Sequence, residues 1–227
     1  MTLARAAAAE GVGTTGLLLA IVGSGIMAER LSGGNAAIAL CANSAATGCA
    51  LFVLIATFER LSGAHFNPLV TLLAAAHREI APRVALAFIA IQIAGAVCGV
   101  MLAHAMFDLP ALQAATRPRA GAGQWLGEGV ATAGLMLVLL LAKPARPHAV
   151  PALIATYIAA AYWFTSSTSF ANPAVTLARS LTDTFTGIRP ADAPAFVTAQ
   201  AVGALAGVAL ARWLMRRPPS ARSDAKT

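Results

Sequence analysis

Two asparagine–proline pairs are the residues of this chain best suited to contact a passing solute. Asn67 and Pro68 open the stretch NPLVTL, and Asn172 and Pro173 open the closely similar stretch NPAVTL. Asparagine favours the cap of a helix and proline its first turn, so each pair predicts the start of a short helix. The amide of each asparagine also carries two N–H donors, which can bind an uncharged solute through its oxygen atoms.

The composition of the chain indicates a membrane protein. Its 227 residues are 58% hydrophobic and 11% charged, with a mean hydropathy of +0.72, whereas a soluble domain carries about 25% charged residues. Six apolar runs are long enough to cross a bilayer at about 20 residues each, and they lie at 8–28, 36–58, 83–105, 124–142, 149–166 and 194–215. Two further runs, 67–76 and 172–182, begin at the Asn-Pro pairs and are too short to span.

The chain contains an internal repeat. The stretch EGVGTTG at Glu10 matches EGVATAG at Glu128, and QIAGA at Gln92 matches QAVGA at Gln200. Each half therefore reads span, span, half-span, span, and an odd number of spans places the two halves in opposite orientations. We expect a single channel domain over 1–215, with inverted repeats at about 8–105 and 124–215, followed by a basic cytoplasmic tail at 216–227.

In such inverted halves, the two short helices enter from opposite faces and meet at their N-termini. Irregular backbone at this depth is tolerated where protein buries it or where it lines a water-filled cavity. The positive helix ends and the two asparagine amides would then form a polar waist that donates hydrogen bonds and repels cations. The alternative is that the motifs are ordinary caps on buried re-entrant helices.

The repeated NPxVTL motif, the paired glutamates and the QxxGA elements resemble the aquaporin and aquaglyceroporin family, also called major intrinsic proteins, over residues 8–215. The resemblance implies an all-α, right-handed bundle of six transmembrane helices and two re-entrant half-helices. It also implies one pore per protomer, a homotetramer, and a facilitator with no cofactor, no metal and no enzymatic activity.

The resemblance also assigns roles to individual residues. Asn67-Pro68-Leu69 and Asn172-Pro173-Ala174 would form the pore waist. Glu10 and Glu128 would accept hydrogen bonds from the loops before the half-helices, with a proton relay as the alternative. His65 would line the cytoplasmic vestibule, although a loop histidine without contact to solute is an equally simple reading.

The chain departs from the family pattern at two positions. Leu69 replaces the usual alanine of the first motif, and Val175 stands where the family usually has an arginine. Counting back from each Asn-Pro pair without gaps places Thr47, Ala160 and Ser169 beside Val175 in the outer selectivity filter. Arg179 lies four residues further on, either in the outer vestibule or as a cap of the half-helix. If the count slips, the aromatic residues Tyr157, Tyr162, Trp163 and Phe164 are the candidates for filter bulk.

A filter of small residues predicts a passive channel for uncharged, polyhydroxylated solutes larger than water. Resemblance to bacterial members without the filter arginine implies arsenous acid and related metalloid hydroxides first, then glycerol, and also water. The alternatives are a mainly water-selective aquaporin and an inverted-repeat secondary transporter. A transporter usually needs an ionisable residue at the midplane, for which only Glu10 and Glu128 are candidates.

The distribution of charge predicts the topology. Eleven of the 16 lysines and arginines lie in segments on the same side as both termini, and five lie in the opposite segments. This bias predicts that both termini lie in the cytoplasm, and the resemblance to bacterial family members implies a multi-pass protein of the bacterial inner membrane. The basic residues form no face interleaved with aromatics, which argues against nucleic-acid binding. No spacing typical of a catalytic or metal-binding constellation is present in the sequence.

Overall fold

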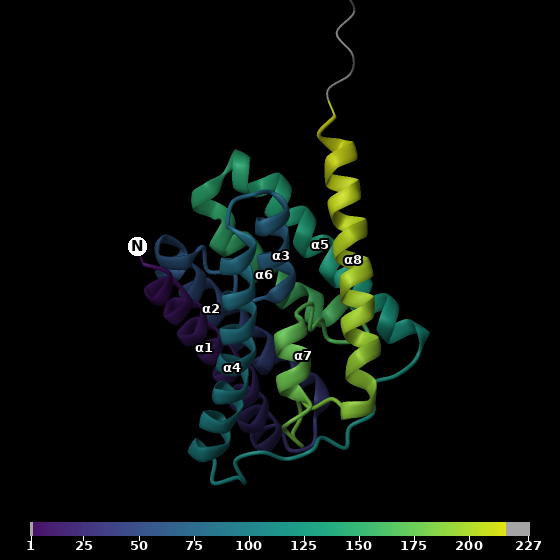
Figure 1. Cartoon of the computed structure of the whole chain (residues 1–227). Coiled ribbons are helices and arrows are strands. Elements are labelled where there is room, and N and C mark those ends of the chain that lie inside the picture. The colour runs from purple at the N-terminus through teal and green to yellow at the C-terminus, as the bar shows by residue number, and fades with distance from the viewer. Residues whose placement is uncertain (1, 217–227) are drawn as a thin grey trace, which may run out of the picture.

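The structure is a computed structural model that describes residues 2–216. The predicted basic tail at 216–227 lies outside the described residues, apart from Arg216. The described part is helical and contains no β-strand, and the long helices form a bundle (Figure 1). The six bundle helices are α1 (Leu3–Leu31), α2 (Ala36–Ser62), α4 (Pro82–Met106), α5 (Ala122–Ala145), α6 (Val150–Phe164) and α8 (Ala193–Leu214). Two short helices, α3 (Pro68–Ala76) and α7 (Pro173–Arg179), follow the Asn-Pro motifs, and two 3₁₀ turns, η1 (Pro147–Ala149) and η2 (Pro190–Asp192), precede α6 and α8.

The predicted all-α fold, with six bundle helices and two half-helices, is confirmed. By length and composition, five helical segments of the described chain are able to cross a membrane. Helix α6 is shorter: its 15 residues extend about 22 Å at 1.5 Å per residue, less than the roughly 30 Å of a hydrocarbon core. The span predicted at 149–166 ends early because Thr165 leaves the helix for the loop that carries the second motif.

The two halves of the chain pack in the same way. Helix α1 packs most extensively against α4, and the matching helix α5 packs against α8. At both crossings, backbones meet at glycines of the repeated motifs. A Cβ atom on Gly95 would lie 2.5 Å from the Gly11 carbonyl oxygen, and one on Gly203 would lie 2.2 Å from that of Gly129. Glycine at these positions therefore permits an approach that any side chain would block.

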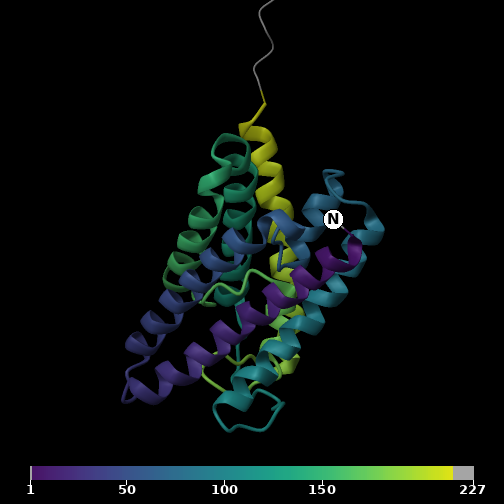
Figure 2. The same cartoon turned by 90° about the vertical axis from the view of Figure 1, so that its left-hand side faces the viewer.

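The half-helices extend in opposite directions from the middle of the bundle, with α3 above α7 in Figure 1. Proline occupies the first turn of each, and Asn67 and Asn172 are their N-caps. The start of α1 and the end of α8 lie toward the same end of the bundle, the upper one in Figure 1, and Figure 2 gives the same arrangement from a second side. An even number of bundle helices requires this placement of the two ends.

The distribution of side chains is that of a membrane protein with a polar interior. Large apolar side chains are exposed on the outer faces of the helices, for example Leu86, Leu126 and Leu205. Inside the bundle, the polar residues Glu10 and Glu128 are completely buried. Polar groups within a bilayer usually face the interior of the bundle and mark the functional region.

Candidate functional site

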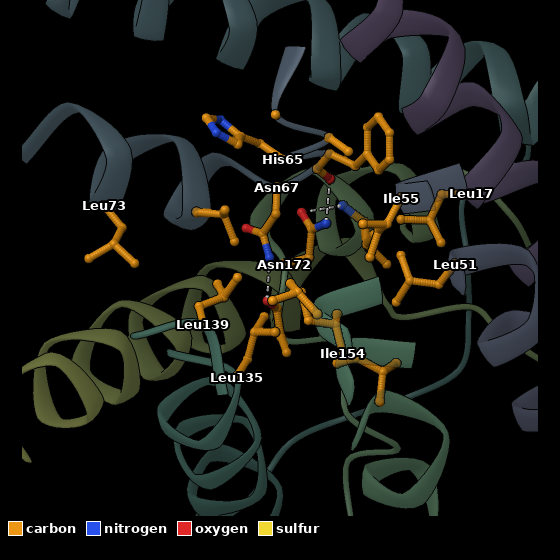
Figure 3. Close-up of a pocket in the computed structure, with 18 of the residues that line it drawn as sticks. Leu17, Leu51, Ile55, His65, Asn67, Leu73, Leu135, Leu139, Ile154 and Asn172 are labelled. Atoms are coloured by element: carbon orange, nitrogen blue, oxygen red, sulfur yellow. Dashed lines mark hydrogen bonds between the residues drawn. The ribbon is translucent and has the colours of Figure 1, made fainter. Parts of the chain in front are cut away.

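A cavity of about 130 Å³ runs through the middle of the bundle and contains both asparagines of the repeated motifs. Figure 3 shows Asn67 and Asn172 beside one another in this cavity, with leucine and isoleucine side chains around them. One end of the cavity contains His65, and the opposite end, formed by Ser169, Val175 and Arg179, is called the Arg179 end below.

The two asparagines cap the half-helices and also bind across the centre. The Asn67 side-chain oxygen accepts a hydrogen bond from Leu69 N at 2.9 Å, and the Asn172 oxygen accepts from Ala174 N and Val175 N at 3.0 and 3.3 Å. Each amide nitrogen has two hydrogens. Asn67 Nδ2 donates to the Ala171 carbonyl at 2.8 Å and Asn172 Nδ2 to the Phe66 carbonyl at 2.7 Å. One N–H per asparagine is then left for a solute in the cavity.

The loops before the asparagines adopt an unusual backbone conformation. Phe66 and Ala171 both have φ of 48°, and Ala64 and Ser169 both have φ of 49°. This left-handed region costs a non-glycine residue about 1 kcal/mol or more. The same conformation recurs at matching positions of the two repeats, and both loops line the cavity.

Glu10 and Glu128 stabilise these loops in matching ways. Glu10 accepts hydrogen bonds from the backbone N–H groups of His65 and Phe66 at 2.9 and 2.7 Å. Glu128 accepts from those of Phe170 and Ala171 at 2.8 and 2.9 Å. A hydrogen bond to a charged group contributes about 1.5–3 kcal/mol, enough to offset the strain of the left-handed residues.

Two buried glutamines complete the support. Gln92 Nε2 donates to Glu10 at 2.8 Å and to Thr71 Oγ1 at 2.9 Å. Gln200 Nε2 donates to Glu128 at 2.6 Å and to Thr176 Oγ1 at 2.8 Å. The repeated QxxGA element signalled these glutamines in the sequence, but their contacts to the glutamates were not predicted.

The remaining motif residues lie beside the cavity and do not line it. Pro68 and Ala174 are buried, and Leu69 is half-buried and packs against the hydrophobic core. From α3 the cavity is lined instead by Val70, Leu73 and Ala74. The Leu69 side chain therefore packs into the core beside the waist and does not line the cavity.

At the Arg179 end, the structure brings together three of the four residues predicted for the filter. Thr47, Ser169 and Val175 all line the cavity and are buried. Ala160 does not: it is exposed on α6 and lies outside the cavity. The α6 residues that line the cavity are Val150, Ile154, Ile158 and Tyr162, which recur every four residues and so share one helix face.

The gap-free count is therefore corrected at α6. Ala160 lies midway between Ile158 and Tyr162 along the chain, about 200° around the helix from each. The count failed because a gap-free count from Asn172 across the loop 165–171 does not fix which face of α6 lines the cavity. Tyr162 occupies the cavity in place of Ala160, and its hydroxyl donates a weak hydrogen bond to Thr47 Oγ1 at 3.4 Å.

The Arg179 guanidinium is buried at this end of the cavity, and the side chain is 2% exposed. Its Nε donates to the Thr186 carbonyl, and its Cζ lies 3.4 Å from the centroid of the Phe170 ring. The Arg179 side chain thus binds a neighbouring loop. It does not cap the half-helix through the carbonyls at the end of α7. Arg179 Nη1 and Ser169 Oγ are both buried and have no hydrogen-bond partner within the described residues, so neither atom is held by the protein.

At the opposite end, His65 lines the cavity together with Glu59, His77, Glu79 and Lys143. The His65 Nδ1 lies 3.1 Å from Thr71 Oγ1, and its ring packs edge-on against Phe88 with centroids 5.8 Å apart. Lys143 and Glu79 form an exposed ion pair of 2.7 Å. This end is therefore hydrophilic and carries charges of both signs.

The walls between the two ends are apolar on one side and polar on the other. Leucine and isoleucine side chains of α1, α2, α5 and α6 form the apolar side: Leu17, Ile21, Leu51, Ile55, Leu135, Leu139, Ile154 and Ile158. The two motif loops and their asparagines form the polar side. Such a passage suits a molecule that has one face of hydroxyl groups and one less polar face.

Among residues 2–216, no group of three His, Cys, Asp or Glu side chains is arranged to hold a metal ion.

Comparisons with known proteins agree with this geometry. The model of the family described as "Major intrinsic protein" matches residues 1–162. The chain is 51% identical over 214 residues to "Aquaglyceroporin AqpS" of Rhizobium meliloti (strain 1021), covering 94% of this chain and 91% of that protein. The X-ray structure of the aquaglyceroporin from Plasmodium falciparum superposes with a TM-score of 0.70 at 20% identity, covering 93% of this chain and 95% of that one.

The structural likeness at that low identity concerns the fold, and the family is established by the sequence. Both the matched family model and the relative extend over more than half of the chain, and together they include both Asn-Pro motifs. This chain therefore belongs to the major intrinsic protein family, whose members are membrane channels and not enzymes.

Proposed function

We propose that the protein is a passive channel for small uncharged solutes with several hydroxyl groups. Arsenous acid and related metalloid hydroxides rank first, followed by glycerol, and water also passes. The observation that carries the proposal is the composition of the Arg179 end, where three compact side chains, those of Val175, Thr47 and Ser169, line the cavity. Ser169 and Arg179 line this end of the cavity; the serine hydroxyl can donate or accept and the guanidinium can donate, so we infer that a hydroxylated solute binds them there.

The relationship to "Aquaglyceroporin AqpS" supports this solute class, since its name refers to glycerol-conducting channels. The two-sided wall of the cavity supports it as well. A solute that loses water on entry regains hydrogen bonds from the loops and keeps its less polar face against leucine and isoleucine. The waist asparagines provide two further donors along the same path.

A mainly water-selective channel is the second candidate, and a specific observation favours it. Tyr162 and Arg179 both extend into the cavity, and a bulky aromatic ring beside a guanidinium narrows a passage. The width left between the small residues and these two large side chains decides whether solutes larger than water pass. A secondary transporter has less support, because Glu10 and Glu128 are fully engaged by loop N–H groups and glutamines.

We place the protein in a bacterial inner membrane as a homotetramer with both termini in the cytoplasm. In this orientation, His65 lies in the cytoplasmic vestibule and Arg179 at the outer entrance. The excess of lysine and arginine on the side of the termini supports the orientation. The apolar outer faces of the bundle provide surfaces both for lipid and for neighbouring protomers.

Purified protein in liposomes tests the proposal by stopped-flow light scattering with water, glycerol and boric acid, and by arsenite uptake. We expect each solute to enter faster than in protein-free liposomes, with the permeabilities of glycerol and arsenous acid well above that background. Rapid water flow with solute permeabilities at background would instead identify the water-selective alternative.

A further inference from the structure

Arg119 lies behind the residues that line the Arg179 end of the cavity, in contact with the Phe170 ring, and comes from a segment that belongs to neither repeat. It lies in the linker 107–121 between α4 and α5, which runs along the lower end of the bundle in Figures 1 and 2. Despite this position in a loop, its side chain is only 7% exposed. A charged side chain is rarely buried to this extent unless specific contacts hold it.

The Arg119 guanidinium connects the loop of Ser169, which lines this end of the cavity, to the loop of Thr186 and Gly187 behind it. Its Nη1 donates to the Ser167 carbonyl at 3.1 Å and lies 3.4 Å from Thr168 Oγ1, directly before Ser169. Its Nε donates to the Gly187 carbonyl at 2.8 Å. Gly187 follows Thr186, whose carbonyl accepts the hydrogen bond of Arg179. One side chain therefore fixes both the loop of Ser169 and the loop that holds Arg179.

The ring of Phe170 joins Arg119 to Arg179. The Cζ atom of Arg119 lies 5.0 Å from the ring centroid and that of Arg179 lies 3.4 Å from it, both within the range of a cation–π contact. Phe170 also packs edge-on against Phe196 at 5.2 Å, as His65 packs against Phe88 in the first repeat. The second site has phenylalanine where the first has histidine, and two guanidiniums lie against its ring.

The backbone of Arg119 is anchored as well. Its N–H donates to Asp192 Oδ2 at 2.9 Å, and Asp192 also forms an ion pair of 2.8 Å with Arg189. The Asp192 carboxylate therefore accepts hydrogen bonds from both the Arg119 backbone and the Arg189 side chain. The linker is thereby fixed at the point where Arg119 enters the bundle.

We propose that Arg119 is a positioning residue that sets the solute selectivity and the cation barrier of this channel. It holds Ser169 and Arg179 at the end of the cavity and adds a second buried positive charge beside them. Fixed positive charge near a constriction raises the barrier to cations. The inference rests on the proposed channel function, and it predicts that a residue outside both repeats controls which solutes enter.

The test compares Arg119→Gln and Arg119→Lys with a matched control, Arg117→Gln. Arg117 lies in the same linker, donates to the Phe185 carbonyl at 2.6 Å and stacks on the Phe185 ring at 5.2 Å. Arg117 is exposed, whereas Arg119 is buried, and neither residue lines the cavity. Water permeability, glycerol permeability and proton leak are measured in liposomes with equal amounts of inserted protein.

We expect Arg119→Gln to raise the ratio of glycerol to water permeability by about tenfold, the effect of losing one or two net hydrogen bonds. Its proton leak should also rise. Arg119→Lys should keep the leak low, since it keeps the charge, but should shift the permeability ratio because one ammonium cannot reproduce the planar contacts to both loops. Arg117→Gln removes a contact to Phe185 alone and keeps the contacts to the Ser169 loop, so it should change both quantities much less than Arg119→Gln.

The proposal is overturned if inserted Arg119→Gln matches the wild type in both the permeability ratio and the proton leak. If the glutamine variant does not insert, Arg119→Lys decides, and an unchanged permeability ratio overturns the positioning role. A wild-type protein that passes water but not glycerol would refute the proposed solute class. In that case we still expect Arg119→Gln to pass glycerol and to leak protons. A variant that does neither would refute the role of Arg119.

Discussion

Asn67 and Asn172 each donate a hydrogen bond to the carbonyl of the residue that precedes the other, Asn67 to Ala171 and Asn172 to Phe66. This reciprocal pair joins the two inverted repeats at the centre of the cavity. Each asparagine thus caps its own half-helix, fixes the opposite loop and keeps one N–H for the lumen. The waist is therefore a single unit made by both repeats.

Replacing Asn172 with Asp should reduce solute and water permeability to near background. The carboxylate cannot donate to the Phe66 carbonyl or to a solute, and its charge would bind to the positive ends of the half-helices. Stopped-flow measurement on inserted protein checks this, with Asn35→Asp as a control at a helix cap outside the cavity. Near-normal permeation through Asn172→Asp would mean that the motif serves only as a cap.

Replacing Val175 with Arg should lower the permeability to arsenous acid and glycerol more than the permeability to water. Val175 lines the cavity near Ser169, so a larger side chain there excludes the larger solute first. Val175→Leu adds bulk without charge and separates the steric effect from the electrostatic one. Equal reductions for water and glycerol, or no reduction, would show that Val175 does not control selectivity.

Replacing Arg179 with Ala should increase proton and cation leak and raise the relative permeability of larger solutes. The change removes a buried charge from the end of the cavity together with its stacking on Phe170. Proton leak is measured with an enclosed pH-sensitive dye, and Arg179→Lys retains the charge as a control. A variant that is less stable but equally selective would support the helix-end interpretation of Arg179.

Replacing Gly203 with Ala should lower the free energy of unfolding in detergent by roughly 1–3 kcal/mol, the cost of overpacking a core. The unfolding temperature should fall accordingly. The new Cβ would lie 2.2 Å from the Gly129 carbonyl oxygen and 2.7 Å from its Cα, so α5 and α8 would have to separate. Gly23→Ala is the matched control, because its Cβ would meet only Phe107 at 3.6 Å. Similar unfolding temperatures for the two variants would contradict the close crossing.

Much of this fold could be predicted from the sequence because the repeat constrains it. An odd number of spans per half requires inverted halves, and an Asn-Pro pair before a short apolar run requires a helix start. The end of α6 could not be predicted, since Tyr162, Trp163 and Phe164 continue an apolar run that leaves the helix only at Thr165. Ala160 was misplaced because a gap-free count from Asn172 does not fix which face of α6 lines the cavity.

The contribution of the linker was also hidden from the sequence. Arg119 has no counterpart in the repeat, and its segment has the composition of an ordinary loop. Its role depends on contacts with residues 48 and 68 positions away, which no local pattern indicates. Arg179 was identified by its spacing from Val175, but its burial against Phe170 depends on the loop that returns at Thr186.

The central claim, that this is a passive channel, is tested most directly by glycerol uptake into proteoliposomes with and without proton and sodium gradients. The account predicts uptake that is faster than in protein-free liposomes, unchanged when both gradients are dissipated by ionophores, and linear with the glycerol gradient. Uptake that collapses when an ion gradient is removed would contradict the account and would place the protein among coupled transporters.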